Sequence, residues 1–395
     1  MTGRLSGIER ATAVQAAIGA FAVEFVALRR DLHRHPELAF EEHRTSAIVA
    51  EFLARWGYEV TAGIGGTGVV GTLRRGNGLR HLGLRADMDA LPITEATGLP
   101  WASRQTGAMH ACGHDGHTAI LLAAARHLAE SGDFNGALTV IFQPAEEIGA
   151  GARRMIGEGL FERFPCDAVF GLHNWPGLAN GRFAVIDGPA MAAVDKALVT
   201  VCGKGGHGAA PHETVDPVVA SAHVITALQS IVARNVDPLD AGVVTVGAIH
   251  GGSASNVIPD SVEMKLTLRS FRPEVRALLE ARVPALVRAQ AESFGATAEV
   301  TYQRGFPAVV NRPGDAEIVR SVVAESHGVA AIAGDFRPRT ASEDFAFFLE
   351  ERPGAFIFVG NGDSAPLHSP AYDFNDANLI PAATVWVRLA ESFLS

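Results

Sequence analysis

The chain has few cysteines, three among 395 residues, at positions 112, 166 and 202. An odd number of widely spaced cysteines argues against a disulfide framework and favours a reducing compartment. The N-terminal part has no compact apolar segment followed by a cleavage motif, and no apolar run reaches the roughly 20 residues that a membrane helix needs. We therefore expect a cytoplasmic protein with no membrane partner.

Positive charge is also scarce. The 33 lysines and arginines are outnumbered by 43 aspartates and glutamates, which gives a formal net charge of −10. No basic stripe interleaved with aromatic residues is present, so nucleic acid is excluded as a partner. An anionic substrate would need individually placed arginines.

Several common motifs are missing. The chain has neither the phosphate-binding G-x-x-x-x-G-K-[ST] loop nor the G-x-S-x-G turn of serine hydrolases. Residues 63–68 do match G-x-G-x-x-G, but the β-branched residues that follow predict a strand, whereas dinucleotide binding requires a helix there. We therefore expect no nucleotide cofactor.

The length and the hydrophobic pattern predict the fold class. A chain of 395 residues is too long for a single core, so two domains are expected. Apolar runs typical of buried strands alternate with segments of helical periodicity, which predicts an α/β fold with a mixed sheet and helices on both faces. The predicted strands cover residues 69–73, 81–85, 137–142, 168–172 and 356–359. The predicted helices cover residues 14–32, 42–56, 118–131, 151–158, 315–327, 342–350 and 378–393.

A middle segment has a different order of elements. Its predicted order is β-α-β-β-α-β, which is typical of a ferredoxin-like unit. We predict that residues 191–302 form this inserted domain, and that residues 1–190 and 303–395 together form a discontinuous catalytic domain. The predicted strands are 197–201, 243–249, 262–268 and 298–302, and the predicted helices are 216–234 and 273–294.

Polar side chains follow three of the predicted strands in the catalytic domain. Asp87 and Asp89 follow one strand, Glu146 and Glu147 the next, and His173 a third. Because ligands bind outside the carboxyl ends of strands in open α/β sheets, we expect these groups to converge on one crevice.

The stretch HACGHDGH, residues 110–117, supplies further candidate ligands. Cys112 and His114 are two residues apart in a predicted loop, close enough to hold one centre. His110 and His117 have weaker cases: one fits a supporting role beside the metal, and the other fits the first turn of a helix that Asp115 would cap. We leave both outside the ligand list.

Thiolate, imidazole and carboxylate are together the ligand types of zinc and similar divalent metals. Consecutive side chains at a strand end point to opposite sides, so Glu147 could bind metal while Glu146 stays free as the general base for a bound water. His173 and His368 are further candidate ligands, although each also fits a buried histidine of the core.

In the inserted domain, a glycine-rich loop presents His207, which could polarise a carbonyl or stabilise an oxyanion. Asn256 and Arg269 could together bind a carboxylate. From the sequence alone, each of these residues could equally be an ordinary exposed side chain without a functional role.

Seven motifs follow one another along the chain: DLHRHPEL (31–38), RADMDALP (85–92), MHACGHDGH (109–117), QPAEE (143–147), GH (206–207), NVIP (256–259) and SEDF (342–345). Taken in this order, they resemble the aminoacylase/carboxypeptidase-type family of co-catalytic metallopeptidases. Within it they are similar to the amidohydrolase branch of hippurate hydrolases, N-acyl-amino-acid deacylases and plant indole-acetyl-amino-acid hydrolases. The resemblance spans nearly the whole chain, and the cysteine-containing motif is specific to that branch.

The resemblance implies two divalent metal ions per subunit, bridged by Cys112 where other branches have an aspartate. Zinc or manganese is expected, with cobalt or nickel as alternatives because the same ligands accept several metals. Other branches begin the second motif with a ligating histidine where this chain has Arg85. The implied roles are His114 and His173 on one ion, Glu147 and His368 on the other, Glu146 as general base, and Asp87 as a supporting or cis-peptide-associated aspartate.

The resemblance also implies that the inserted domain forms a homodimer, or a tetramer. His207 would then reach the neighbouring subunit's site as an oxyanion stabiliser, and Asn256 and Arg269 would bind the substrate carboxylate. Domain closure is expected to complete the site.

The sequence thus predicts a metal-dependent amidohydrolase that cleaves N-acyl-L-amino acids to a carboxylic acid and a free amino acid. Within the same family, a dipeptidase or an N-acetyl- or N-succinyl-diaminopimelate-type deacylase is the alternative. Two rivals come from other classes. One is a zinc-stabilised binding protein without turnover. The other is a metal-independent enzyme that uses Cys112 as nucleophile.

Overall fold

The computed structural model describes residues 7–395. The chain divides into two compact units, one built from residues up to Ala190 with Val310–Arg337 and Asp344–Ser395, the other from Met191–Val309 with Pro338–Glu343. The second unit extends past residue 302 because its last strand continues to Arg304, and the N–H of Gly305 then donates to Asp195 of the same unit.

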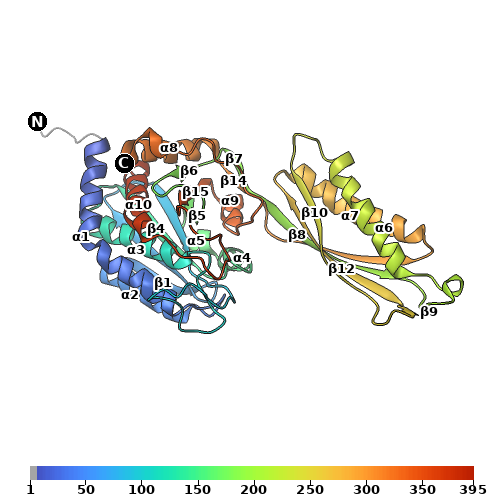
Figure 1. The fold of residues 1–395 in the computed structure, drawn as a ribbon. Coiled ribbons are helices and arrows are strands. Elements are labelled where there is room, and N and C mark those ends of the chain that lie inside the picture. The colour runs from blue at the N-terminus through green and yellow to red at the C-terminus, as the bar shows by residue number, and fades with distance from the viewer. Residues whose placement is uncertain (1–6) are drawn as a thin grey trace, which may run out of the picture. The chain divides into compact units, whose positions relative to one another are not determined.

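The first unit contains a seven-stranded mixed sheet (Figure 1). Its central strands β4, β3, β5 and β15 are mutually parallel neighbours, while β1, β2 and β6 pair antiparallel. The central strands are buried on both faces, which is why they are continuous apolar runs in the sequence. The sheet order is β1 (Glu59–Ile64), β2 (Gly68–Arg75), β4 (Gly136–Gln143), β3 (His81–Asp87), β5 (Ala168–Trp175), β15 (Gly354–Gly360) and β6 (Phe183–Ala184).

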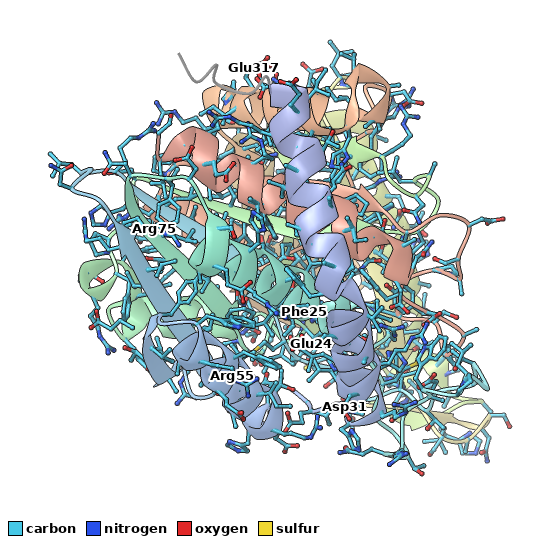
Figure 2. All side chains as sticks on the ribbon, turned by 90° about the vertical axis from the view of Figure 1, so that its left-hand side faces the viewer. Glu24, Phe25, Asp31, Arg55, Arg75 and Glu317 are labelled. Atoms are coloured by element: carbon cyan, nitrogen blue, oxygen red, sulfur yellow. The ribbon has the colours of Figure 1, made fainter. Side chains whose placement is uncertain are left out.

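Helices cover both faces of this sheet (Figure 1). On one face α1 (Gly7–Arg34), α3 (His114–Ser131) and α10 (Leu379–Phe393) pack against one another. Figure 2 faces α1, where Phe25 is buried with its ring centroid 6.0 Å from that of Trp56. The remaining helices are α2 (His43–Arg55), α4 (Gly151–Gly157), α5 (Leu160–Arg163), α8 (Pro313–His327) and α9 (Ala346–Glu351), with 3-10 turns at Val329–Ala331 and Asp376–Asn378.

The second unit has a four-stranded antiparallel sheet with two helices packed on it (Figure 1). Alternate residues of β8, such as Val199 and Val201, are buried against the helices, and this alternation is the period of a half-buried strand. Its sheet order is β10 (Gly242–His250), β12 (Ser261–Ser270), β8 (Ala193–Cys202) and β13 (Thr297–Arg304), and its helices are α6 (Pro217–Asn235) and α7 (Pro273–Glu292). Shorter elements are β9 (Gly206–His207), β11 (Val257–Ile258), and a 3-10 turn at Pro211–Glu213. Strands β7 (Gly188–Met191) and β14 (Val309–Asn311) lie where the chain passes between the units.

The strand predicted after the glycines of residues 63–68 is confirmed, because these residues contribute the turn of the β1–β2 hairpin and no helix follows them. Two other local expectations differ from the structure. Strand β1 itself was not predicted, because most of its residues are exposed or half-exposed. Helix α9 begins at Ala346 and not at residue 342.

Two helices, α1 and α6, are long and apolar enough to cross a membrane by length and composition alone. Each also packs within its own unit, α1 against α3 and α6 against α7. A core helix of a folded domain has the same composition, so these segments are weak evidence for a membrane span.

Candidate metal centre

The parallel strands of the first unit end at one edge of the sheet, and the polar residues predicted from the sequence lie there. Strand β3 ends at Asp87, β4 ends three residues before Glu146, and β5 includes His173 near its end. All three side chains are buried. This placement is the one expected for a ligand site outside the carboxyl ends of parallel strands.

The stretch at residues 110–117 leads into α3, which begins at His114 and so four residues earlier than predicted. The N-cap is Gly113 with φ 90°, so the predicted capping role of Asp115 is wrong. A Cβ atom at Gly113 would lie 2.4 Å from the amide nitrogen of Asn174 and 2.5 Å from the hydroxyl of Tyr372. Only glycine fits this turn.

Two groups of possible ligands share Cys112. One group is Cys112, His114 and His173, and the other is Cys112, Glu147 and His368; within each, the ligand atoms lie within 4.8 Å of one another. The sulfur of Cys112 lies 3.3 Å from Nε2 of His173, and Nε2 of His368 lies 3.4 Å from Glu147. These are the same two sets that the resemblance pairs on separate ions.

Hydrogen bonds fix which ring nitrogen faces this cluster. Nδ1 of His173 donates to the carbonyl of Asn174 at 2.6 Å, and Nδ1 of His114 lies 3.2 Å from a carboxylate oxygen of Asp89. Each ring therefore directs Nε2 toward the cluster. Such partners on the second nitrogen are typical of metal-ligating histidines.

The cluster also contains buried polar atoms that lack a partner. Nε2 of His114 and Oε1 of Glu147 make no hydrogen bond with any residue that the structure describes. They lie 3.9 Å apart. Buried polar atoms are nearly always hydrogen-bonded, so two orphans facing each other fit a site for a cation.

The charges around the cluster also fit a site for a cation. Burial lowers the pKa of His114, but the carboxylates of Asp87, Asp89 and Glu147 outweigh it and raise the pKa to about 10. Burial, reinforced by Glu147, raises the pKa of the Cys112 thiol well above its ordinary value. A divalent cation would offset this excess of negative charge and favour the thiolate.

Asp87 lies beside His114, with Oδ2 at 3.8 Å from Nε2 of that ring. It accepts hydrogen bonds from Arg85 and from Nδ1 of His117, both at 2.6 Å. The N–H of Asn174 donates to Nε2 of His117, so His117 supports the site through Asp87 and has no nitrogen left for a metal. Within residues 7–395 no peptide bond is cis, so the cis-peptide alternative for Asp87 is wrong.

Glu146 and Glu147 both face the cluster. Their carboxylates lie within 4.8 Å of His114 and of each other, so the expectation that they point to opposite sides is wrong. That rule holds for extended backbone, whereas β4 ends at Gln143 and Ala145 has φ 52°. The carboxylate of Glu42 accepts a hydrogen bond from the N–H of Ala145 at 2.8 Å, and this bond stabilises the turn.

The remaining predicted residues belong to the second unit. His207 is exposed on β9, and its Nδ1 accepts the N–H of Ala209 at 3.0 Å. Asn256 is adjacent to this strand, since its carbonyl accepts the N–H of Gly208 at 2.8 Å. Arg269, on β12, donates to the hydroxyl of Ser342 at 2.5 Å.

Several supporting residues were not singled out from the sequence. Asn174 donates to the carbonyl of Cys112 at 2.6 Å and accepts from the hydroxyl of Tyr372 at 2.7 Å, which fixes the cysteine loop. The N–H of Glu147 donates to Asp89 at 3.0 Å. Asp89 was expected at the site from its place after β3, whereas Tyr372 carries no local signal in the sequence because it lies far along the chain from Asn174.

Asp115, displaced from its expected capping role, forms a buried ion pair with His33. Nδ1 of His33 lies 2.9 Å from Asp115, and its Nε2 lies 3.3 Å from Glu95. Burial lowers the pKa of His33, but Asp115 outweighs it and raises the pKa from 6.5 to about 9. The imidazolium is therefore held charged in the folded protein.

This pair predicts a pH-dependent stability. The pKa of His33 is higher in the folded state than in the unfolded state. The contribution of this pair to the free energy of unfolding is therefore complete below about pH 6.5 and is lost as the pH rises through about 9. The loss corresponds to roughly 3 kcal/mol of unfolding free energy. Chemical denaturation at a series of pH values should show this fall in the wild type and a smaller one in His33→Gln. Equal slopes in the two proteins would contradict the assignment.

The sequence profile of peptidase family M20/M25/M40 matches residues 83–392. The chain belongs to this family. The predicted resemblance is thereby confirmed, and the protein is a hydrolase of the M20 family.

Individual relatives span nearly the whole M20 chain. The hippurate hydrolase of Campylobacter jejuni is 43% identical over 371 residues, which are 94% of this chain and 97% of that protein. The N-acetyl-L-cysteine deacetylase of Bacillus subtilis is 42% identical over 372 residues, 94% of this chain and 88% of that protein. The crystal structure of the Bacillus subtilis YXEP protein, described as a dinuclear metal-binding peptidase of the M20 family, is 33% identical with a TM-score of 0.82 and covers 95% of this chain and 99% of its own.

Proposed function

We propose that this M20 hydrolase cleaves the amide bond of N-acyl-L-amino acids and releases a carboxylic acid and a free amino acid. The observation that carries the proposal is the pair of ligand groups sharing Cys112, with the carboxylate of Glu146 beside them. The relatives named as a hippurate hydrolase and an N-acetyl-L-cysteine deacetylase support this substrate class.

We propose that two divalent ions occupy the cluster. The residues that would hold them are Cys112, which is common to both groups of ligands, with His114 and His173 in one group and Glu147 and His368 in the other. When bound, such ions lower the pKa of water and polarise a carbonyl. Zinc and manganese both suit these ligands, and cobalt or nickel would also fit. Metal analysis of the purified protein distinguishes them, and a protein without metal would contradict the proposal.

Glu146 is the proposed general base. Its carboxylate is buried, and the N–H of Asp344 faces Oε1 at 3.4 Å. In the forward step it accepts a proton from the attacking water, and in the next step it delivers that proton to the leaving amide nitrogen. One carboxylate can serve in both steps because the attacked carbon and the leaving nitrogen share the bond that is cleaved.

We propose that His207 stabilises the developing oxyanion and that Asn256 and Arg269 bind the substrate carboxylate. Because Nδ1 of His207 accepts a hydrogen bond, its neutral ring carries the proton on Nε2 and can donate it. Burial lowers the pKa of Arg269, and its two hydrogen bonds go to neutral oxygens of Ser342 and Thr340. A half-buried guanidinium that makes no ion pair with a carboxylate of residues 7–395 suits an anionic substrate group.

We propose that the second unit is a ferredoxin-like domain that forms a homodimer, or a tetramer, and delivers His207 to the neighbouring subunit. The order of β8, α6, β10, β12, α7 and β13 along the chain supports the fold type. A monomer in light scattering at assay concentration, with full activity, would contradict this assembly.

The proposed substrate class predicts a clear order of activities. The metal-reconstituted protein should hydrolyse hippurate, N-acetyl-amino acids or indole-acetyl-amino acids with kcat/KM at least tenfold above that for dipeptides. Arg269→Met should lower kcat/KM for hippurate by roughly 10- to 100-fold, because one charge-assisted contact is lost. It should change turnover of hippuramide, which has no carboxylate, much less.

Other outcomes separate the alternatives. Preference for dipeptides would support a dipeptidase, and preference for N-acetyl- or N-succinyl-diaminopimelate would support that type of deacylase. Tightly bound metal without turnover of any amide would indicate a binding protein. Inactivation by thiol alkylation but not by a chelator would indicate a cysteine nucleophile, a mechanism that the raised pKa of the Cys112 thiol disfavours.

We propose a cytoplasmic location. The three cysteines are free in the structure, which suits a reducing compartment. Recovery of the protein from a membrane or extracellular fraction would contradict it.

A further inference from the structure

Asp344 is a fully buried carboxylate of the first unit that is not among the proposed ligands. Its Oδ1 accepts from Nε2 of Gln143 at 2.7 Å and from Arg85 at 3.4 Å. Its Oδ2 accepts the N–H of Ala152 at 3.1 Å. Donors from β3, the end of β4 and the start of α4 therefore converge on one side chain and fix the backbone of Asp344.

The backbone that is fixed in this way faces the proposed base. The N–H of Asp344 lies 3.4 Å from Oε1 of Glu146, long for a hydrogen bond but directed at one oxygen of the carboxylate. Contacts of this kind tighten when substrate binds. The N–H is therefore placed to orient the carboxylate of Glu146.

Arg85 links this contact to the metal cluster. Its Nε donates to Gln143 at 2.8 Å, and its Nη1 donates to Asp87 at 2.6 Å. One buried guanidinium thus lies between Asp87, which is next to the proposed ligand His114, and Asp344, whose N–H faces the proposed base. Loss of either carboxylate would leave buried charge poorly compensated.

We propose that Asp344 is a positioning residue that holds the Glu146 carboxylate in its productive orientation. This inference rests on the proposed function, in which Glu146 is the general base. It assigns no metal contact and no proton transfer to Asp344. A residue with this role affects the chemical step and leaves both substrate binding and metal content in place.

The test is Asp344→Asn, which keeps the size of the side chain but leaves one acceptor oxygen for donors from three residues. We expect kcat on hippurate to fall by about 10- to 100-fold, with KM within about twofold and metal content unchanged. Gln143→Met removes one neutral donor to Asp344 and the acceptor of Arg85 Nε. It should give a smaller loss of kcat, and it serves if Asp344→Asn does not fold. Asp315→Asn is the matched control, a buried carboxylate on α8 whose replacement should not change kcat.

A double-mutant cycle separates positioning from general destabilisation. In a Glu146→Gln background the same Asp344→Asn change should lower the residual kcat by less than about twofold, because there is no longer a base to orient. An undiminished loss in that background, or an unchanged kcat in Asp344→Asn alone, would overturn the proposal while leaving the proposed function intact. Near wild-type turnover by Glu146→Gln would overturn the assignment of the base itself.

Discussion

Replacement of Glu146 by glutamine is expected to lower kcat on hippurate by about 1000-fold, because an amide cannot accept the proton of the attacking water. The change preserves size and leaves the proposed ligands untouched, so metal content and KM should stay close to wild type. Steady-state kinetics together with metal analysis on the same sample measure all three quantities.

The matched control for this change is Glu162→Gln, an exposed glutamate on α5. It should keep wild-type kcat. A Glu146→Gln protein with full metal and more than about a tenth of wild-type turnover would show that another group takes the proton. A variant that lost its metal would indicate that Glu146 is itself a ligand.

Much of the first unit could be predicted because its central strands are buried on both faces. Such strands appear in the sequence as short apolar runs, and β3, β4 and β5 each lie within about three residues of their expected ends. Strand β1 could not be predicted because its half-exposed residues do not form such a run.

The chemistry of the site was predictable from residue types and strand ends, but its local geometry was not. The common orientation of Glu146 and Glu147 depends on the positive φ of Ala145, and the start of α3 depends on Gly113. Neither conformation follows from hydrophobic periodicity.

The supporting residues depend on contacts between distant parts of the chain. Asp344 is about 200 residues from both Gln143 and Glu146, and Tyr372 is equally far from Asn174. A single sequence holds no local pattern that reports such contacts. Only the fold brings these residues together, and for this reason the role of Asp344 emerges from the structure.

Replacement of Cys112 by alanine is expected to have the second large effect. Cys112 is common to both ligand groups, so its loss leaves each proposed ion with only two of its three protein ligands. Metal content should fall from about two ions per subunit to one or fewer, and kcat should fall by more than about 1000-fold. Metal analysis after dialysis, followed by assay with added zinc or manganese, measures both effects.

Two further variants show whether the thiol acts as a ligand or as a nucleophile. Cys112→Asp should recover metal content and part of the activity, because a carboxylate can bridge two ions but cannot replace a thiolate as nucleophile. Cys166→Ala, at another buried free thiol, should change neither quantity. Full metal content and turnover in Cys112→Ala would remove this residue from the site. An inactive Cys112→Asp protein that retains two ions would instead favour covalent catalysis, because the metal would then be present and only the nucleophile would be missing.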